Sequence, residues 1–598
     1  MKSKKNQTSH HMEPPQDHME LQPSEDSHLF TNNGSTSRPA KDVSSGEQLN
    51  VDGLLAGPVG ACGLWQWLII VLIVLSGPSM AFFPVFVNAV PSIRCRMEPE
   101  IENLFTDLEI PFVNVSEIIG PKSGCSRYAY NWTSIKSIRD IISFHTSTSE
   151  VQTEACPHGY VYESTQFQYP GSIVAEFNLV CSQTWLAPMG TSLYIFGMFL
   201  GYIVGGWLGD KYGRRPTAIG FSMLEICAGI LVSLAPNHHV YHFARTISAF
   251  ANTGRASVMR ILPLEITLAK YRGYFVSAIV LGVLFFHRAA LAGFAYLIPN
   301  WRVLHAVAIA PCFLSFLFFC ILPESPRWLV SQDKQVQAVR VLKTGLRYNR
   351  ICRKRKSQSM QLELLLRRLE SHETTIPATR KTEKATSSIS QHLKPSSFDR
   401  QQLKFLIIGA LLMNTQSLAL FGVVLYARVI NDYVYIVVLV NSLTSIPGPV
   451  VASIAYRFYK YRRLPLAVCL ATACVALSVG GAYTLFWKPA TDTVLNVCCN
   501  CALVMYSATL VMLSTYLAEL FPSATRTRAM GILSGIGRLG GSFSTFVNQL
   551  DAAAGHGVPV IFYACVSALQ FCLLFFLADT SGENLQDKRT VVKLPEQQ

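Results

Sequence analysis

The sequence predicts an all-α membrane protein with twelve transmembrane helices. Half of the 598 residues are hydrophobic and only 15% are charged, and the mean hydropathy is +0.29, which is typical of chains surrounded by lipid. About twelve apolar stretches reach the roughly 20 residues that a helix needs to cross a bilayer core. Lys and Arg gather in alternate loops, so membrane topology accounts for the net charge of +14 without a nucleic acid partner.

The predicted spans form two groups of six, separated by about 80 polar residues. This layout is typical of transporters built from two related halves, with the substrate near the midplane between them. The predicted spans are residues 64–87, 187–208, 217–235, 240–264, 273–297, 302–322, 404–426, 434–456, 465–487, 494–517, 527–549 and 558–578.

The charge pattern also predicts the topology. Both termini lie on the same side as the basic loops, so the positive-inside rule places them in the cytosol. The first 60 residues are polar and contain no apolar run typical of a signal peptide, so we expect a disordered tail. The expected organisation is a cytosolic tail at 1–60, a first half at 61–322 with an extracellular loop at 88–186, a cytosolic linker at 323–403, a second half at 404–578 and a cytosolic tail at 579–598.

The long loop between the first two spans has features of a small secreted domain. Its four cysteines are Cys95, Cys125, Cys156 and Cys181. Four cysteines in an oxidising compartment are expected to pair, and three connectivities are open. Asn114 and Asn131 begin N-glycosylation sequons in the same loop. We therefore expect a disulfide-linked, glycosylated ectodomain.

The segment GWLGDKYGRR (206–215) joins the second and third spans and places an acid among three bases. It resembles the signature loop of the major facilitator superfamily. In that family, carboxylates and arginines pair at the cytosolic ends of the helices, and the pairs lock one conformation and break in the other. The residues to which this resemblance gives gating roles are Asp210, Arg214, Arg215, Glu265, Arg272, Glu324, Arg327, Glu519 and Arg526.

Four further segments narrow the resemblance. CPHGYVYESTQFQYPGSIVAEFNLVC (156–181), LPESPRWL (322–329), ELFPSATR (519–526) and LADTSGENLQD (577–587) occur in the order found in organic cation, organic anion and carnitine transporters. The chain is thus similar to the solute carrier family 22-like group. The resemblance implies the major facilitator fold with two six-helix halves, a plasma-membrane location and alternating-access transport of small organic ions.

The resemblance weakens in the second half. The second copy of the signature loop should carry Asp and Gly before its basic pair, but here Tyr461 directly precedes Arg462 and Arg463. In the eighth span the family usually has a glutamate where this chain has Ser445. These departures put a conventional charge-relay network in the second half in doubt.

Several arginines lie inside the predicted spans, where an unpaired charge costs several kcal/mol. Arg288 is too far from either end of the fifth span to reach water completely. It therefore needs water, an anion or a carboxylate such as Glu225. Arg255 and Arg260 are five residues apart in the fourth span, so they point about 140° apart.

Arg538 is the most informative arginine. It occupies the position in the eleventh span where the resemblance implies aspartate in cation carriers and arginine in anion carriers. A guanidinium in a low-dielectric cavity binds a carboxylate or sulfate and repels an organic cation. The resemblance also places Arg260 where cation carriers have a cavity-lining tyrosine. The predicted substrate-binding residues are Arg538, Arg288, Arg260, Arg255 and His287.

Structural roles compete with functional ones at several positions. His287 could bind substrate, take up a proton or make one packing hydrogen bond. Glu225 could neutralise one of the arginines. Arg245, Glu265 and Arg272 are expected to form scaffold pairs at the cytosolic surface.

The sequence thus favours a carrier of small organic anions that catalyses no reaction. It shows no nucleotide-binding loop, so transport should be driven by gradients or exchange, with a counter-transported anion or a coupling ion. The alternatives are a carrier of organic cations or zwitterions, and a transport-inactive receptor or scaffold derived from the family. No cofactor, metal ion or nucleic acid is expected, and the partners are the substrate and the lipid bilayer.

Overall fold

Helices occupy the positions of all twelve predicted spans in the computed structural model. Eight helical segments among the described residues are long and apolar enough to cross a membrane by length and composition alone. The structure describes residues 30–31, 48–78, 80–121, 124–130, 132, 152–165, 168–332, 334–349, 367, 400–426, 433–444, 446–459, 461–521 and 523–577.

The first half contains spans 1 to 6, of which spans 1, 5 and 6 are divided into shorter pieces. Its elements are α2 (Leu64–Leu75), η3 (Met80–Phe82) and α3 (Pro84–Val87) for span 1; α8 (Leu186–Tyr212), α9 (Arg214–Ser233) and α10 (His238–Glu265) for spans 2 to 4; α11 (Ala269–Leu281), η7 (Gly282–Phe286) and α12 (His287–Leu297) for span 5; and α13 (Trp301–Ile309), η8 (Ala310–Leu317) and α14 (Phe318–Ile321) for span 6.

The second half contains spans 7 to 12, and only span 8 is divided. Its elements are α19 (Arg400–Tyr426) for span 7, α20 (Val434–Leu443) and α21 (Pro447–Phe458) for span 8, α22 (Arg463–Trp487), α23 (Thr493–Glu519) and α24 (Ser523–Val547) for spans 9 to 11, the short connecting helix α25 (Leu550–Ala554), and α26 (Val558–Leu574) for span 12.

Small residues on α8 allow α10 to pack closely against it. Cβ atoms added at Gly197, Gly201 and Gly205 would each lie within 2.5 Å of a backbone oxygen of α10. Glycines at four-residue spacing are typical of membrane helices whose backbones touch. This contact fixes spans 2 and 4, which both carry residues of the candidate site.

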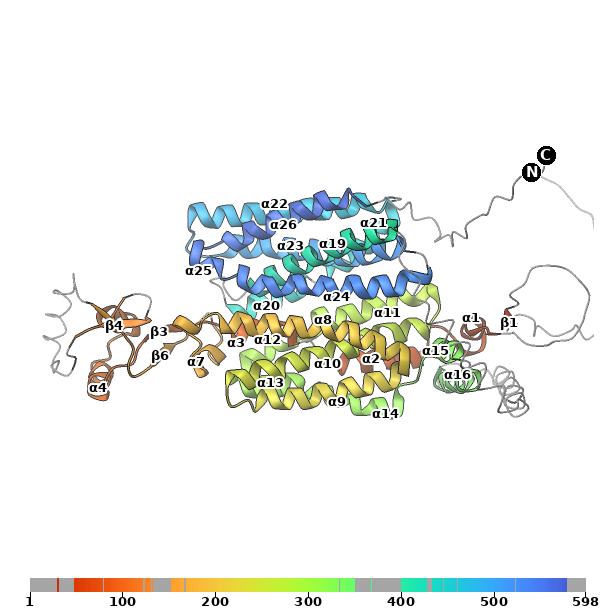
Figure 1. Ribbon diagram of the computed structural model, residues 1–598, viewed down its shortest axis with the longest axis horizontal. Helices are drawn as coiled ribbons and strands as arrows, with labels where there is room; N and C mark the ends of the chain where they lie inside the picture. Colours follow the sequence, from red (N-terminus) through yellow and green to blue (C-terminus); the bar gives the residue numbers. More distant parts are fainter. Residues whose placement is uncertain are drawn as a thin grey trace, which may run out of the picture.

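The two halves lie side by side, with α24 along α8 and α20 along α12 (Figure 1). At the end of the bundle that carries residues 88–186, here called the loop end, Ser192 Oγ donates to the Ser542 carbonyl over 2.6 Å and lies 2.9 Å from Thr545 Oγ1. The Tyr435 ring of the second half lies against Phe86 and Tyr296 of the first. Polar and aromatic contacts therefore join the halves at the loop end.

The loop between spans 1 and 2, the predicted ectodomain, forms a small domain at one end of the molecule (Figure 1). Disulfides join Cys95 to Cys156 and Cys125 to Cys181, which selects one of the three open connectivities. Its elements are β3 (Ser92–Cys95), α4 (Pro99–Asp107), α5 (Phe112–Ile119), β4 (Ser126–Tyr128), β5 (Thr153–Ala155), β6 (Tyr160–Glu163), α7 (Ile173–Glu176) and η6 (Cys181–Gln183), with β3 antiparallel to β6 and β4 antiparallel to β5.

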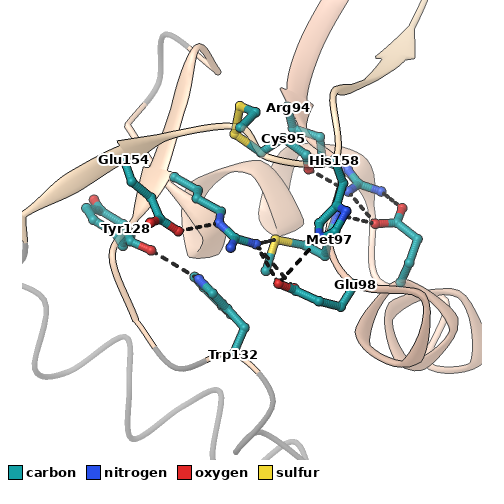
Figure 2. A network of polar contacts seen from close by, with 11 residues as sticks. Arg94, Cys95, Met97, Glu98, Tyr128, Trp132, Glu154 and His158 are labelled. Atoms are coloured by element: carbon teal, nitrogen blue, oxygen red, sulfur yellow. Dashed lines mark hydrogen bonds and ion pairs between the residues drawn. A yellow bond between two sulfur atoms is a disulfide. The ribbon is translucent and has the colours of Figure 1, made fainter.

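Buried arginines organise this ectodomain. Arg127 bridges Glu98 and Glu154 over 3.0 and 2.7 Å (Figure 2). Since its side chain is almost fully buried, the two carboxylates supply the charged partners that burial requires. The sequon residue Asn114 is exposed on α5, and Asn131 lies outside the described residues.

The ectodomain is attached to the first half. Arg302, at the start of span 6, donates to Glu176 of α7 over 3.0 Å, and Tyr169 Oη donates to the Ile298 carbonyl over 2.8 Å. Ser172 Oγ donates to the Val87 carbonyl over 3.1 Å. Because these bonds reach spans 1, 5 and 6, the ectodomain is tied to one half.

Short elements cover the opposite end of the first half, here called the latch end. They are β1 (Phe30–Thr31), β2 (Gln48–Leu49), α1 (Val51–Leu54), η2 (Leu55–Val59), α15 (Pro326–Ser331) and α16 (Gln335–Asn349). Residues 48–59 correct the prediction that all of 1–60 is disordered. Their apolar side chains, such as Leu54 and Leu55, are buried with Val339 and Leu342 of α16, and this burial stabilises the segment. Phe30–Thr31 form β1, which is antiparallel to β2. Residues 1–29 and 32–47, most of the predicted linker and the tail at 579–598 lie outside the described residues.

Candidate substrate-binding site

Two predicted arginines meet at a tyrosine between the halves. Arg538 of α24 donates to Tyr202 Oη of α8 over 3.4 Å, and its guanidinium carbon lies 5.4 Å from the centre of the Tyr202 ring. Arg260 of α10 lies at the same distance from that ring. Tyr202 therefore joins one arginine from each half.

The third predicted arginine reaches the same group through two stacked rings. Arg538 also lies 5.7 Å from the Phe421 ring of α19, and Phe421 stacks on Phe82 of η3 with centres 6.2 Å apart. Arg288 lies 4.3 Å from the Phe82 ring and donates to the Asn441 carbonyl of α20 over 3.4 Å. We call Phe82, Tyr202, Arg260, Arg288, Phe421 and Arg538 the central cluster.

The central cluster gathers positive charge around an aromatic core. Arg260 is exposed and Arg538 half-buried, whereas Arg288 is buried. Among the residues that the structure describes, neither Arg260 nor Arg538 forms an ion pair with a carboxylate. Ring faces attract a guanidinium by about 0.5–2 kcal/mol but do not neutralise it. The cluster therefore keeps positive charge that an anion could meet.

Arg255 lies apart from the central cluster. Its Nε donates to Glu225 Oε2 over 2.9 Å, and both side chains are at least 96% buried. Glu225 thus meets Arg255 rather than Arg288, which the sequence had left open. Arg255 and Arg260 reach different neighbours, as their predicted separation around the helix requires.

His287 makes a structural hydrogen bond. Its Nε2 lies 2.7 Å from the carbonyl oxygen of Val74 in span 1. In a regular helix this carbonyl would accept the N–H of residue 78, but that residue is Pro78 and has none. Of the alternatives for His287, the structure shows the packing hydrogen bond.

The predicted gating residues at the latch end form one network. Arg214 lies 3.0 Å from both Asp210 and Glu265. Glu324 accepts the backbone N–H groups of Arg214 and Arg215 over 2.7 and 3.2 Å. These N–H groups begin α9 and have no partner within the helix, so a carboxylate is favourable there.

Arg327 extends the network to the N-terminal segment. It donates to Asp52 of α1 over 2.6 Å and to the Glu265 carbonyl over 3.1 Å. The side chains of Arg272, Glu519 and Arg526, which were also predicted to gate, lie outside the described residues.

Arg245 corrects one scaffold prediction. It lies near the loop end of α10, where it donates to Tyr241 Oη over 2.9 Å and to the Met80 carbonyl over 3.2 Å. The predicted partner, Glu265, is at the other end of this helix, about 30 Å away at 1.5 Å per residue. A pair between them is geometrically excluded.

Sequence reasoning missed the aromatic members of the central cluster. Phe82, Tyr202 and Phe421 stand in apolar spans where aromatic residues most often pack against neighbours.

Asn252, which lies outside the central cluster, was also missed. It donates to the Pro78 carbonyl over 3.0 Å. A signal was present, because a Gly-Pro pair within a span predicts backbone groups that need outside partners.

Comparison with known proteins places this chain in a family. The family model described as "Sugar (and other) transporter" matches residues 131–591, well over half of the chain. Solute carrier family 22 member 1 of Bos taurus is 26% identical over 564 residues, covering 90% of this chain and 92% of the relative. The organic cation transporter-like protein of Drosophila melanogaster is 25% identical and covers 88% of this chain and 89% of its own length.

A solved structure supports the fold. The inward-open conformation of the xylose transporter XylE from E. coli superposes with a TM-score of 0.53 at 18% identity, covering 69% of this chain and 90% of that one. The predicted twelve-helix fold is thereby confirmed. The chain belongs to the sugar (and other) transporter family, and it is a solute carrier family 22-like transporter of the major facilitator superfamily rather than an enzyme.

Proposed function

We propose that this transporter carries small organic anions by alternating access. The observation that carries the proposal is the central cluster, in which three arginines from both halves surround three aromatic rings. A guanidinium binds a carboxylate or sulfate through two parallel hydrogen bonds, and the rings offer an apolar surface to the rest of the ion. The expected substrate is therefore an organic anion with an apolar or aromatic body.

The placement of the arginines links binding to movement. Arg260 and Tyr202 belong to the first half, and Arg538 belongs to the second. A rocking motion of the halves changes the distance between these groups, so an anion held by both arginines favours the conformation in which both can reach it. A ligand shifts a conformational equilibrium only through such a difference in affinity.

The protein is proposed to lie in the plasma membrane with the loop end outside and both termini in the cytosol. Disulfides form in oxidising compartments, and two join the ectodomain. With this orientation, the contacts of Ser192 and Tyr435 between the halves close the site to the outside. Transport is driven by a gradient or by exchange with a second anion.

A cation carrier is the second candidate. One relative is named an organic cation transporter-like protein, and aromatic rings also attract organic cations. The central cluster favours the anion because its rings already face guanidinium groups, whose charge repels a second cation.

The experiment compares uptake by the wild type and the Arg538→Asp variant in cells. Radiolabelled aromatic carboxylate, dicarboxylate, carnitine and quaternary amine are tested in parallel. We expect Arg538→Asp to abolish anion uptake at unchanged surface expression, because it replaces the ligand-facing charge with its opposite. The matched control is Arg347→Asp, which reverses an exposed charge on α16 and should leave uptake unchanged. Anion uptake that survives Arg538→Asp would refute the site assignment.

A further inference from the structure

The regular helix of span 1 is interrupted part-way along the span. The helix α2 ends at Leu75, and η3 begins at Met80. Between them Pro78 has no N–H and ends the regular hydrogen-bond ladder. Backbone groups freed inside a membrane must find partners in the protein, since lipid offers none.

Side chains from spans 4 and 5 bond the carbonyls around this break, in addition to the backbone N–H groups of Gly77 and Phe83, which donate to the Val74 and Met80 carbonyls over 3.3 Å. His287 Nε2 bonds the Val74 carbonyl over 2.7 Å, and Asn252 Nδ2 donates to the Pro78 carbonyl over 3.0 Å. Arg245 donates to the Met80 carbonyl over 3.2 Å. The carbonyls before, within and after the break are therefore each held by a side chain of another helix.

Glu225 accepts hydrogen bonds from two residues beside the break. Its two oxygens accept hydrogen bonds from Asn252 over 2.6 Å and from Arg255 over 2.9 Å. The Arg255 guanidinium points its two terminal nitrogens at Gly77, where an added Cβ would be 2.7 Å from Nη1 and 2.8 Å from Nη2. We call Glu225, Asn252, Arg255 and His287 the collar.

We propose that the collar positions the central cluster and thereby determines substrate affinity. Phe82 follows the break by four residues, and its ring contacts both Arg288 and Phe421. The collar fixes the backbone that carries this ring, although none of its members belongs to the cluster. The residues of the collar are therefore positioning residues. The inference rests on the proposed function in one respect, namely that the substrate binds at the central cluster.

A designed clash and its relief test the proposal. Gly77→Ala places a methyl group against the Arg255 guanidinium and should displace the broken segment. We expect the KM for the transported substrate to rise about tenfold while the maximal rate stays within about twofold, since small misplacements weaken binding. Adding Arg255→Lys removes the planar group that meets the methyl. The double variant should recover most of the affinity. A merely destabilised fold would instead lower the amount of transporter at the surface and the maximal rate while leaving KM unchanged.

Two further variants complete the test. Asn252→Leu removes the donor to Pro78 and should also raise KM. Its matched control is Gln416→Leu, which removes a buried amide donor of similar length, 2.9 Å to the Tyr506 carbonyl, from the second half. The control should lower thermal stability without changing KM.

The proposal is overturned if Gly77→Ala and Asn252→Leu reach the surface with unchanged KM, or if Arg255→Lys fails to rescue Gly77→Ala. Because KM is measured for whichever ion is carried, an error in the proposed sign of the substrate charge leaves this test intact. That error appears instead in the Arg538→Asp experiment.

Discussion

The two halves handle polarity inside the bundle in different ways. The first half holds charges in pairs, with Arg255 bonded to Glu225 and Arg214 to Glu265. In the described part of the second half, neutral groups fill the comparable places. Gln416 donates to the Tyr506 carbonyl, Gln570 to Gln416, and Tyr563 to Asn548.

This difference bears on Arg538. In the first half, Arg255 and Arg214 are paired with acids and Arg245 donates to the Met80 carbonyl of span 1, whereas Arg260 and Arg288 belong to the central cluster. Arg538 stands in the middle of α24, in a half whose described core uses amides and hydroxyls. A guanidinium placed there without a carboxylate partner among the described residues supports the proposal that a ligand brings the negative charge.

The largest expected effect is on the buried pair of the first half. Glu225→Gln leaves the Arg255 charge buried without its counter-charge, which should lower the free energy of unfolding by about 3–5 kcal/mol. Gln416→Leu in the second half should cost only about 1–3 kcal/mol. Unfolding in mixed micelles measures both, and equal losses would remove the contrast between the halves.

The next effect concerns the latch end. Glu265→Gln removes one of the carboxylates that hold Arg214, whose side chain is 9% exposed. We expect the transport rate to fall about tenfold, because a change of 1.4 kcal/mol in the balance of conformations has that effect. The comparison variant Tyr461→Asp places an acid directly before Arg462 in the second copy of the signature loop, at an exposed position.

Tyr461→Asp should change the rate by less than about twofold, since exposed ion pairs contribute about 0–1 kcal/mol. Uptake assays at matched surface expression decide the point. A strong effect of Tyr461→Asp with a weak one of Glu265→Gln would reverse the assignment of the latch to the first half.

A separate effect is a pH dependence at the loop end of the second half. His556 lies outside the spans, 2.8 Å from both Asp492 and Asp551. Hydrogen bonds to Asp492 and Asp551 raise the pKa of His556 from 6.5 to about 10. A raised folded-state pKa gives stability that is complete below about 6.5 and is lost as the pH rises through about 10.

Thermal stability should therefore fall between pH 7 and pH 10 more steeply in the wild type than in His556→Gln. Parallel slopes of the two melting temperatures would show that the His556 contacts add nothing to the second half.

Much of the fold could be predicted because hydropathy is a local property. The apolar runs located the spans, and the glycine and charge spacing of 206–215 located the latch. The disulfide partners could not be chosen, since four cysteines alone fix no connectivity. The short helices before span 1 were missed although Leu54, Leu55 and Val59 give that segment an apolar side.

The site was predictable only in part. Resemblance and membrane energetics identified Arg260, Arg288 and Arg538, which the structure brings together. The pairing of Arg255 with Glu225 depends on how spans 3 and 4 are rotated about their axes. This rotation cannot be predicted from a single sequence. Pro78 did carry a signal for the collar, since a proline within a span removes a regular helical hydrogen bond and leaves backbone carbonyls open to side-chain donors.

The most direct test of the central claim is uptake by the purified protein in liposomes with no membrane potential. A radiolabelled aromatic carboxylate and a quaternary amine of similar size are compared. The account predicts saturable carboxylate uptake that preloading with unlabelled carboxylate accelerates, together with quaternary amine uptake no greater than in empty liposomes. Saturable uptake of the quaternary amine without uptake of the carboxylate would contradict it.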